Sequence, residues 1–299
     1  MKAIILAGGK GTRLYPITKY YQKQLLPIHD KPMIYYALSI PMMIGINEIA
    51  IVSTPKGLES LRELFGEGEL LGLKIKYFEQ CENDCIGIAY AILRCEEYIG
   101  DDDFVLVLGD TVLYGAELVN YLKYAKDSLQ TKKKAVIFET YISNTNQFGS
   151  ILYDNVNKPI DIVEKSNYNK QNKAVPGVYF LTKDIFKYSK NISKSNRGEY
   201  EITSALKKYL EDEKLIIKKC GRGIIWIDTG TFSAISMATE FISIVQKNLG
   251  IIIACLEEIS LKQGWISCNK LIDSYELYSG TEYGEYMKKI AQNMIGEKI

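Results

Sequence analysis

Three glycines, Gly8, Gly9 and Gly11, follow a short apolar run near the start of the chain. Because glycine has no side chain, their backbone N–H groups can approach phosphate oxygens closely, and Arg13 adds a cation nearby. The spacing excludes two common phosphate motifs: a dinucleotide fingerprint starting at Gly9 would need glycine where Leu14 stands, and a Walker A loop needs Gly-Lys-Ser/Thr. We therefore predict a phosphate-binding loop of another type, in preference to a simple turn.

Two aspartates each follow an apolar run. Asp110 comes after the run 104–108, and Asp228 comes after Trp226 and Ile227. Carboxylates at the ends of buried strands are where Mg²⁺ is commonly held. The alternative is that each aspartate caps the turn that follows it. Spacing alone does not bring the two together, so a shared magnesium site is a hypothesis at this point.

Two further charged segments are candidates for binding an anion. Glu164 and Lys165 follow a short strand-like run, and Arg197 precedes a helix-like segment. Arginine suits two-pronged contact with phosphate. A surface ion pair is the alternative for the first segment, and a charged helix cap is the alternative for the second. The sequence leaves both open.

The composition restricts the chemistry further. The chain has 299 residues, 37 Lys+Arg against 36 Asp+Glu, and one histidine, His29. A multi-histidine zinc site is impossible, and a Ser-His-Asp triad could use only His29. The net charge of +1 argues against a broad electrostatic surface for nucleic acid or an anionic membrane. The N-terminal apolar run is too short for a signal peptide, and six scattered cysteines suit a reducing compartment, so we expect a cytoplasmic protein.

The first half of the chain alternates between strand-like and helix-like segments. We predict strands at 2–6, 48–53, 73–78 and 104–108, and helices at 32–44, 56–65 and 87–98. Pro41 should kink the first helix or end it early. Such alternation predicts a mostly parallel sheet, in which ligands bind beyond the C-terminal ends of the strands.

The second half has shorter intervals between strands, which favours antiparallel additions. We predict strands at 135–141, 150–153, 160–164, 177–181 and 215–219, and helices at 201–210 and 232–246. From Ile251 a strand-like apolar run precedes three helical segments. The prediction is therefore an α/β fold: a Rossmann-like mixed, mainly parallel sheet flanked by helices, with antiparallel additions and a helical C-terminal appendage. Residues 1–250 would form the body and 251–299 the appendage.

Taken together, these segments resemble a known family. The loop 8–14 is similar to the signature loop of sugar-1-phosphate nucleotidyltransferases, and 23–27 and 30–36 are most similar to the glucose-1-phosphate thymidylyltransferases among them. The resemblance continues through 108–110, 164–165, 177–180, 197–203, 226–230 and 254–266. It covers essentially the whole chain.

The resemblance implies transfer of a thymidylyl group from dTTP to α-D-glucose 1-phosphate, with release of pyrophosphate. It implies Mg²⁺ as cofactor, held by Asp110 and Asp228, and a homotetramer as the assembly. The implied catalytic residues are Arg13, Lys23, Asp110 and Lys165. The implied nucleotide-binding residues are Leu6, Gly8, Gly9, Gly11, Thr12, Gln24, Gln80 and Gly87. The implied sugar-phosphate contacts are Gly149, Glu164, Lys165, Tyr179 and Arg197.

One segment departs from the family pattern. Between Gln80 and Tyr90 the two usual prolines are missing, the loop is two residues longer, and Tyr90 stands in place of a glutamine. This segment borders the expected base site. A related nucleotidyltransferase that uses UTP or another hexose 1-phosphate therefore remains an alternative, as does a nucleotide-sugar sensor without catalysis.

Overall fold

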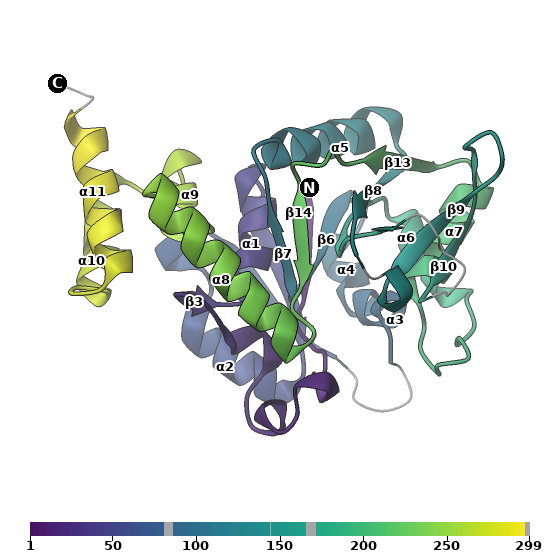
Figure 1. The fold of residues 1–299 in the computed structure, drawn as a ribbon, viewed down its shortest axis with the longest axis horizontal. Helices are drawn as coiled ribbons and strands as arrows, with labels where there is room; N and C mark the ends of the chain where they lie inside the picture. The colour runs from purple at the N-terminus through teal and green to yellow at the C-terminus, as the bar shows by residue number, and fades with distance from the viewer. Residues whose placement is uncertain (81–85, 144, 166–171, 297–299) are drawn as a thin grey trace.

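The computed structural model describes residues 1–80, 86–143, 145–165 and 172–296. Within these residues, an eight-stranded sheet forms the centre of the molecule (Figure 1), in the order β11-β8-β12-β6-β1-β4-β5 with β13 beside β8. Its strands are β1 (Lys2–Leu6), β4 (Glu48–Ser53), β5 (Lys74–Glu79), β6 (Phe104–Leu108), β8 (Ala135–Tyr141), β11 (Lys173–Ala174), β12 (Val178–Leu181) and β13 (Leu215–Lys219).

The strands β1, β4, β5 and β6 run parallel, as the sequence predicts. β1 and β6 are almost entirely buried, which explains their continuous apolar sequences. Leu6 at the end of β1 lies opposite Leu108 of β6 and Val52 of β4. The segments that follow these strands therefore leave the sheet at the same edge.

The antiparallel additions are confirmed with one exception. β12 runs antiparallel to both β6 and β8, but β13 runs parallel to β8. The prediction of an antiparallel strand at 215–219 was wrong because two helices, α6 (Asp184–Lys190) and α7 (Ile202–Glu211), separate β12 from β13 and return the chain in the direction of β8.

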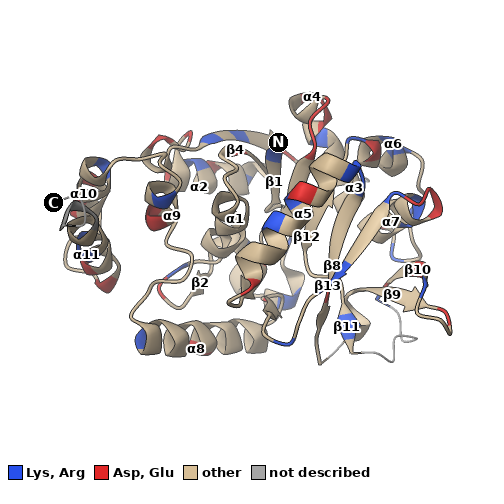
Figure 2. Cartoon of the chain, turned by 90° about the horizontal axis from the view of Figure 1, so that it is seen from above, with Lys and Arg blue, Asp and Glu red and all other residues tan. Residues whose placement is uncertain are grey.

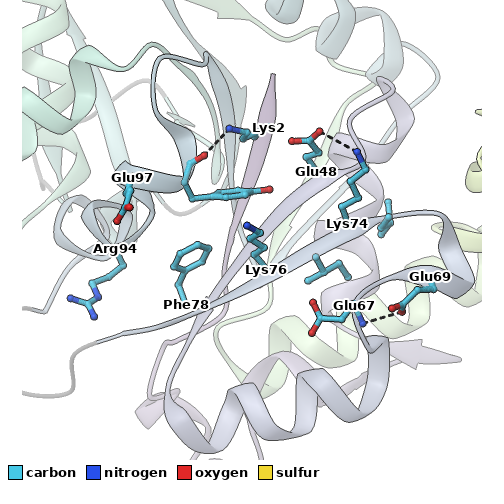
Figure 3. A pocket seen from close by; sticks show the side chains of 12 residues that line it. Lys2, Glu48, Glu67, Glu69, Lys74, Lys76, Phe78, Arg94 and Glu97 are labelled. Carbon is cyan, nitrogen blue, oxygen red and sulfur yellow. Dashed lines mark hydrogen bonds and ion pairs between the residues drawn. The ribbon is translucent and has the colours of Figure 1, made fainter.

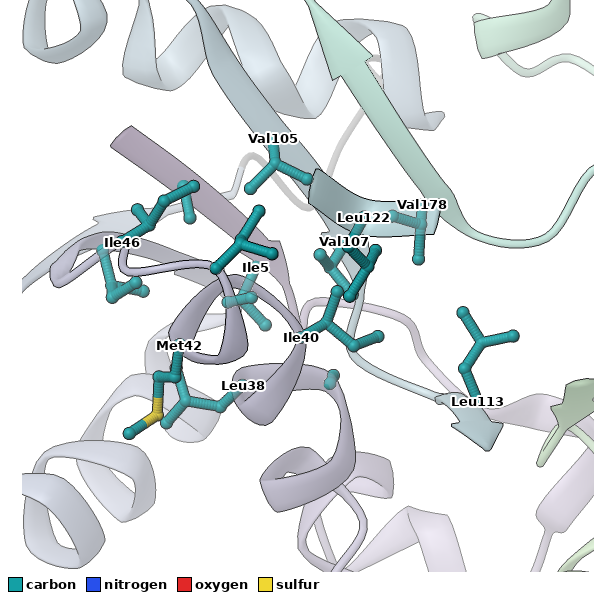
Figure 4. Packing of buried hydrophobic residues seen from close by; sticks show 14 of the residues in the cluster. Ile5, Leu38, Ile40, Met42, Ile46, Val105, Val107, Leu113, Leu122 and Val178 are labelled. Atoms are coloured by element: carbon teal, nitrogen blue, oxygen red, sulfur yellow. The ribbon is translucent and has the colours of Figure 1, made fainter. Parts of the chain in front are cut away.

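Helices cover both faces of the sheet (Figure 1). They are α1 (Ile34–Met43), α2 (Pro55–Phe65), α3 (Ile88–Ala91), α4 (Glu96–Ile99), α5 (Leu118–Lys132), α6 and α7. One core lies where α1 and α5 pack on the sheet (Figure 4), and it joins Ile5 and Val107 to Ile40 and Leu122. Basic and acidic residues are interspersed along the outer helices, as on α5 (Figure 2).

The predicted helices at 32–44 and 87–98 are each modified in the structure. Pro41 lies inside α1, which continues to Met43, so the proline does not end the helix at once, and a kink stays a prediction. A proline this close to the last turn removes only one helical hydrogen bond, and the surrounding residues are buried, so packing holds the helix. The predicted helix 87–98 is divided into α3, a 3₁₀ turn (Ile92–Cys95) and α4.

In the part of the chain that the structure describes, three two-stranded ribbons lie beside the central sheet. They pair β2 (Pro27–Ile28) with β3 (Lys31–Pro32), β7 (Thr111–Tyr114) with β14 (Ile225–Asp228), and β9 (Gly149–Tyr153) with β10 (Pro159–Glu164). Asp228 lies opposite Thr111, the residue after Asp110, and Glu164 lies opposite Gly149. These ribbons bring residues distant in sequence to the edge where β1 and β6 end.

The segment after residue 250 is helical, as predicted. It contains α9 (Leu256–Lys262), α10 (Cys268–Leu277) and α11 (Glu282–Gly296), and α8 (Phe232–Leu249) precedes it. α10 and α11 lie side by side at one end of the molecule (Figure 1) and pack on a small apolar cluster around Leu271 and Met287. The strand-like run at Ile251 forms no strand: Gly250 ends α8 with φ 64°, and the Ile253 N–H donates to the Gln246 side chain instead of to a strand. A boundary at 250 stays a prediction.

No helix among the described residues combines the length and the apolar character needed to cross a membrane.

Candidate active site

A cleft of about 420 Å³ lies at the edge of the sheet where β1 and β6 end. Its position is the one that the parallel strand order predicts. All eight residues implied for nucleotide binding meet in its lining, together with Asp110. The eight are Leu6, Gly8, Gly9, Gly11, Thr12, Gln24, Gln80 and Gly87. The sequence prediction for this half of the site therefore matches one continuous surface.

The glycine loop is held in a defined shape. Gly11 has φ 60°, in the left-handed region that favours glycine, and its carbonyl accepts hydrogen bonds from the Leu14 N–H at 2.8 Å and the Thr18 hydroxyl at 2.7 Å. At Gly8 any side chain would overlap the amide of Gln80. The loop thus presents backbone, rather than side chains, to the cleft.

Lys23 and Asp110 form an ion pair at the floor of the site. The Lys23 side chain is 7% exposed and the Asp110 side chain 24% exposed. The Lys23 ammonium contacts the Asp110 carboxylate directly. Lys23 leaves the surface because it lies in a tight 3₁₀ turn with Gln24 that faces the end of β6. A lysine that looks like a surface residue in the sequence is therefore part of the site.

Asp228 lies next to this pair. Burial raises the pKa of the Asp228 carboxyl, and the nearby Asp110 charge raises it further, while Lys23 and Arg13 oppose the rise. Arg13 reaches the same corner: a side chain on Gly230 would overlap its guanidinium. Arg13 also donates to the Gln147 side chain at 3.0 Å.

The carboxylates of Asp110 and Asp228 fit a divalent cation. Oδ1 of Asp228 is buried and has no hydrogen-bond partner within the described part of the chain, and a carboxylate oxygen of this kind is a ligand that Mg²⁺ accepts. The described residues contain no cluster of three or more His, Cys, Asp or Glu that could enclose a metal. An ion here would need further oxygens from water or from a phosphate, which is usual for Mg²⁺.

The second half of the site is built on β9 and β10. Glu164 is the last residue of β10 and lies opposite Gly149 of β9. A Cβ placed on Gly149 would lie 3.4 Å from Oε2 of Glu164. Burial, followed by the Glu201 charge, raises the pKa of Glu164 to about 7, against the opposing effects of Lys165 and Arg197. Lys165 follows with φ 46°, its N–H bonded to the Phe148 carbonyl at 3.1 Å.

Arg197 is held by two carboxylates for which the sequence predicts no role. Its guanidinium donates to Glu201 and to Glu199, each at 2.9 Å. Glu201 is 5% exposed and also accepts from the Ser195 hydroxyl at 2.9 Å. The alternation of charge around Arg197 in the sequence was the available signal. Arg197 is therefore oriented before any ligand arrives.

Tyr179 is buried between the two halves. It lies on β12 opposite Leu106 of β6 and is 5% exposed. Burial raises the pKa of its hydroxyl, and the charges of Glu164 and Asp110 raise it further. The position connects the β10 side with the floor of the cleft, although the ring itself does not line the cleft.

Gly87 joins the two halves through the backbone. It has φ 130°, and a side chain there would overlap the backbone of Tyr200. On either side of Gly87, the Tyr200 N–H donates to Ile86 at 2.8 Å and the Ala89 N–H donates to Tyr200 at 3.2 Å. The rings of Tyr90 and Tyr200 lie 5.5 Å apart. The departure from the family pattern at 81–85 lies outside the described residues.

Comparisons with known proteins give one consistent result. The family model described as "Nucleotidyl transferase" matches residues 2–244. A glucose-1-phosphate thymidylyltransferase of Neisseria meningitidis is 40% identical over 97% of this chain and 99% of its own length. Among solved structures, a candidate glucose-1-phosphate thymidylyltransferase from Bacillus anthracis has a TM-score of 0.73 at 33% identity, covering 81% of this chain and 94% of that chain. A UDP-glucose pyrophosphorylase bound to UDP-glucose has a TM-score of 0.72 at 27% identity, covering 82% and 98%.

Proposed function

This chain belongs to the nucleotidyl transferase family, and on that premise we propose that it transfers a thymidylyl group from dTTP to α-D-glucose 1-phosphate. The products are dTDP-glucose and pyrophosphate. The observation that carries the proposal is the glycine-lined cleft, which leads from Gln80 and Gly87 to Asp110, with Asp228 close to it. Relatives of nearly the same length named for this reaction support it.

The reaction needs alignment and charge neutralisation more than it needs acid–base chemistry. A phosphate oxygen of the sugar phosphate attacks the α-phosphorus of dTTP, the bond to the β-phosphate oxygen breaks, and pyrophosphate leaves with the electron pair. Phosphate oxygens are already ionised near pH 7. This agrees with a chain that has one histidine, placed outside the cleft.

On the nucleotide side, we assign the loop amides of Gly8, Gly9 and Gly11, with Leu6 and Thr12, to the phosphates and sugar of dTTP. Gln80 and Gly87 would contact the base and Gln24 the nucleoside. Arg13 and Lys23 would neutralise charge on the triphosphate and the departing pyrophosphate. Lys23 can do so because its ammonium is buried beside Asp110 and cannot be fully screened by water.

We assign Asp110 and Asp228 to Mg²⁺, which when bound polarises phosphate oxygens as a Lewis acid. The buried, unpaired oxygen of Asp228 supports this assignment. A chelator should abolish turnover and added Mg²⁺ should restore it. If turnover were unchanged after exhaustive chelation, the two aspartates would have another role.

On the sugar side, Lys165 and Arg197 would hold the phosphate of glucose 1-phosphate. Glu164, Gly149 and Tyr179 would contact the sugar. Two N–H groups of the Arg197 guanidinium donate to Glu199 and Glu201. A guanidinium has five N–H donors, so the others are left for the phosphate. The orientation of the arginine is thereby set in advance.

Pyrophosphate release, measured with dTTP, UTP, CTP and GTP against several hexose 1-phosphates, tests the proposal. We expect dTTP with α-D-glucose 1-phosphate to give the highest kcat/KM, together with dTDP-glucose in equal amount to pyrophosphate. If dTTP were inert while another nucleotide turned over, the assignment of the base would be wrong. Absence of turnover with every pair would leave a binding protein.

UTP is the second candidate nucleotide. It is favoured by the likeness to the UDP-glucose pyrophosphorylase and by the departure at 81–85, close to Gln80. The same assay compares the two bases directly.

We also propose a cytoplasmic homotetramer, from the family resemblance. Sedimentation equilibrium should give about four times the chain mass of 33.9 kDa. A single-chain mass would contradict the tetramer.

A further inference from the structure

The side chain of Gln22 lies just behind the nucleotide cleft, between the ends of β1 and β4. Its amide nitrogen donates to the Ala7 carbonyl and, at 2.7 Å, to Oε1 of Gln24; the Ser53 hydroxyl lies at 3.3 Å. An amide nitrogen carries two hydrogens, and the two nearest acceptors take them. Ser53 donates its own hydrogen to Ala7 at 2.8 Å. Gln22 is thus fixed by two strand ends.

This arrangement decides which end of the Gln24 side chain faces the cleft. A glutamine amide has an oxygen that accepts and a nitrogen that donates, and the two are nearly the same shape. Oε1 of Gln24 is occupied by Gln22. Nε2 of Gln24 lies instead beside the glycine loop, 4.0 Å from where a Cβ on Gly9 would be. Gln24 is 3% exposed, and it lines the cleft whereas Gln22 does not.

A glycine in a helix supports the same reading. Gly57 lies in the first turn of α2, although glycine has a lower helix propensity than alanine. A Cβ at this position would come within 2.8 Å of Oε1 of Gln22 and would overlap the Ser53 hydroxyl. The absence of a side chain at Gly57 therefore leaves the space that the amide of Gln22 occupies.

We propose that Gln22 is a positioning residue: by binding Oε1 of Gln24, it makes Gln24 a hydrogen-bond donor toward an oxygen of the bound nucleotide. The inference rests on the proposed function only in that the cleft takes a nucleotide. Gln22 touches no substrate itself and acts through Gln24. Without Gln22, the Gln24 amide would be free to rotate by half a turn. Its Oε1, which only accepts hydrogen bonds, would then face the nucleotide oxygen, which also only accepts.

Gln22→Glu tests the proposal most directly. A carboxylate cannot donate, so Gln24 would turn its nitrogen toward it and its oxygen toward the nucleotide. We expect the KM for the nucleotide to rise about tenfold, as loss of one hydrogen bond of roughly 1.4 kcal/mol implies, with kcat within threefold and the KM for the sugar phosphate unchanged. Gln22→Met, which keeps the length without the donor, should give a smaller rise of about threefold.

Two further variants separate positioning from a general loss of structure. In a Gln24→Ala background, Gln22→Glu should cause no additional rise in the nucleotide KM. Gly57→Ala should reproduce part of the rise although it lies outside the cleft and improves the helix propensity of α2. Gln130→Glu, on the exposed face of α5, is the matched control and should change neither KM.

The proposal is overturned if Gln22→Glu leaves the nucleotide KM unchanged, or if its effect persists in the Gln24→Ala background. Both measurements use the nucleotide that the wild-type protein turns over, and melting curves confirm that each variant is folded. A preference for UTP over dTTP would therefore revise the proposed function and leave this inference standing. An effect of Gln22→Glu on both KM values equally would indicate a structural role and overturn it.

Discussion

The two ends of the same parallel strands carry two hollows that differ in kind. At the C-terminal ends of β1 and β6 lies the cleft of about 420 Å³ lined by glycines. A larger groove of about 920 Å³ lies where β1, β4 and β5 begin (Figure 3). The first residues of these strands, Lys2, Glu48 and Lys74, line it. Size alone would select the groove as the binding site.

The charges in the groove are largely matched to one another. Four basic and four acidic side chains line it. Lys74 pairs with Glu48 at 3.6 Å, and Lys2 pairs with Asp102 at 3.0 Å and donates to the Tyr98 carbonyl at 2.7 Å. Lys74 and Glu48 are 73% and 40% exposed, and ion pairs this open to water contribute little. The Lys23 side chain beside the cleft is 7% exposed, so its charge is screened far less.

The cleft differs because it contains polar groups that lack partners or are held ready for one. The glycine loop presents its backbone to the cleft, and Asp228, beside Asp110 at its floor, has a buried oxygen without a hydrogen bond among the described residues. Binding capacity therefore follows fixed, buried polar groups rather than volume. Substitutions at the C-terminal ends of the strands should therefore change kcat or KM, and substitutions at their N-terminal ends should not.

Asp110→Asn should have the largest effect. Removing one of the two proposed metal-binding charges should lower kcat by roughly 10³-fold, because electrostatic stabilisation of the transition state is lost. Steady-state pyrophosphate release measures it. The matched control at the strand starts is Asp102→Asn, which removes the Lys2 partner and should leave kcat within twofold. An equal loss of kcat in Asp110→Asn and Asp102→Asn would contradict the proposed difference between the cleft and the groove.

Gly87→Ala should come next. The backbone at φ 130° disfavours any side chain, and a Cβ would overlap Tyr200, so the loop must move. We expect kcat/KM for the nucleotide to fall about 10²-fold, since displacements of about 1 Å cost this much. Gly223→Ala is the control, because nothing lies within 4 Å of its Cβ position. Full activity of the Gly87 variant would show that the loop is not held by Tyr200.

The pH dependence should give an effect of about one order of magnitude. The pKa of Glu164 is raised to about 7, so its carboxyl is mostly protonated at pH 6 and mostly ionised at pH 8. If the ionised form accepts a sugar hydroxyl, the KM for the sugar phosphate should fall about tenfold from pH 6 to pH 8. Glu164→Gln should remove this dependence, beyond that of the sugar phosphate itself. A profile identical to wild type would exclude Glu164 as the titrating group.

Lys76→Ala should have the smallest effect. Lys76 lies in the groove, its ammonium 5.4 Å from the centre of the Tyr98 ring. We expect both KM values and kcat within twofold of wild type, and a free energy of unfolding within about 0.5 kcal/mol. Urea denaturation and the pyrophosphate assay measure these quantities. A selective change in substrate KM would show that the groove takes part in function.

The sequence predicted the cleft well because its signals are local. A continuous apolar run such as Phe104–Leu108 needs two covering layers and thus a buried strand, and the parallel order then places Asp110 at the edge of the sheet. The helix α5 was not predicted, although Leu118, Leu122, Ala125 and Leu129 have helical spacing and are buried. That signal was present in the sequence.

Other features depend on tertiary pairing and leave little trace in sequence. The burial of Lys23 against Asp110 requires a turn to meet a strand 87 positions away. The direction of β13 depends on how α6 and α7 return the chain, and the clamp of Glu199 and Glu201 on Arg197 depends on the local fold of one loop. Spacing cannot report such contacts.

The position of β5 has a consequence for the protein at high concentration. β5 has one neighbouring strand, β4, in the sheet as described, so its other side is an edge that is only partly covered. There the Ile75 N–H donates to the Glu67 carbonyl, and the Glu79 carbonyl accepts from Arg94. Such an edge can recruit strands from other molecules and start aggregation. Lys74 and Lys76 are exposed on it at alternate positions, and an incoming strand would bring their charges out of water. Lys74 and Lys76 thus help to prevent aggregation. Their removal should make the protein aggregate faster in concentrated solution and should leave its turnover unchanged.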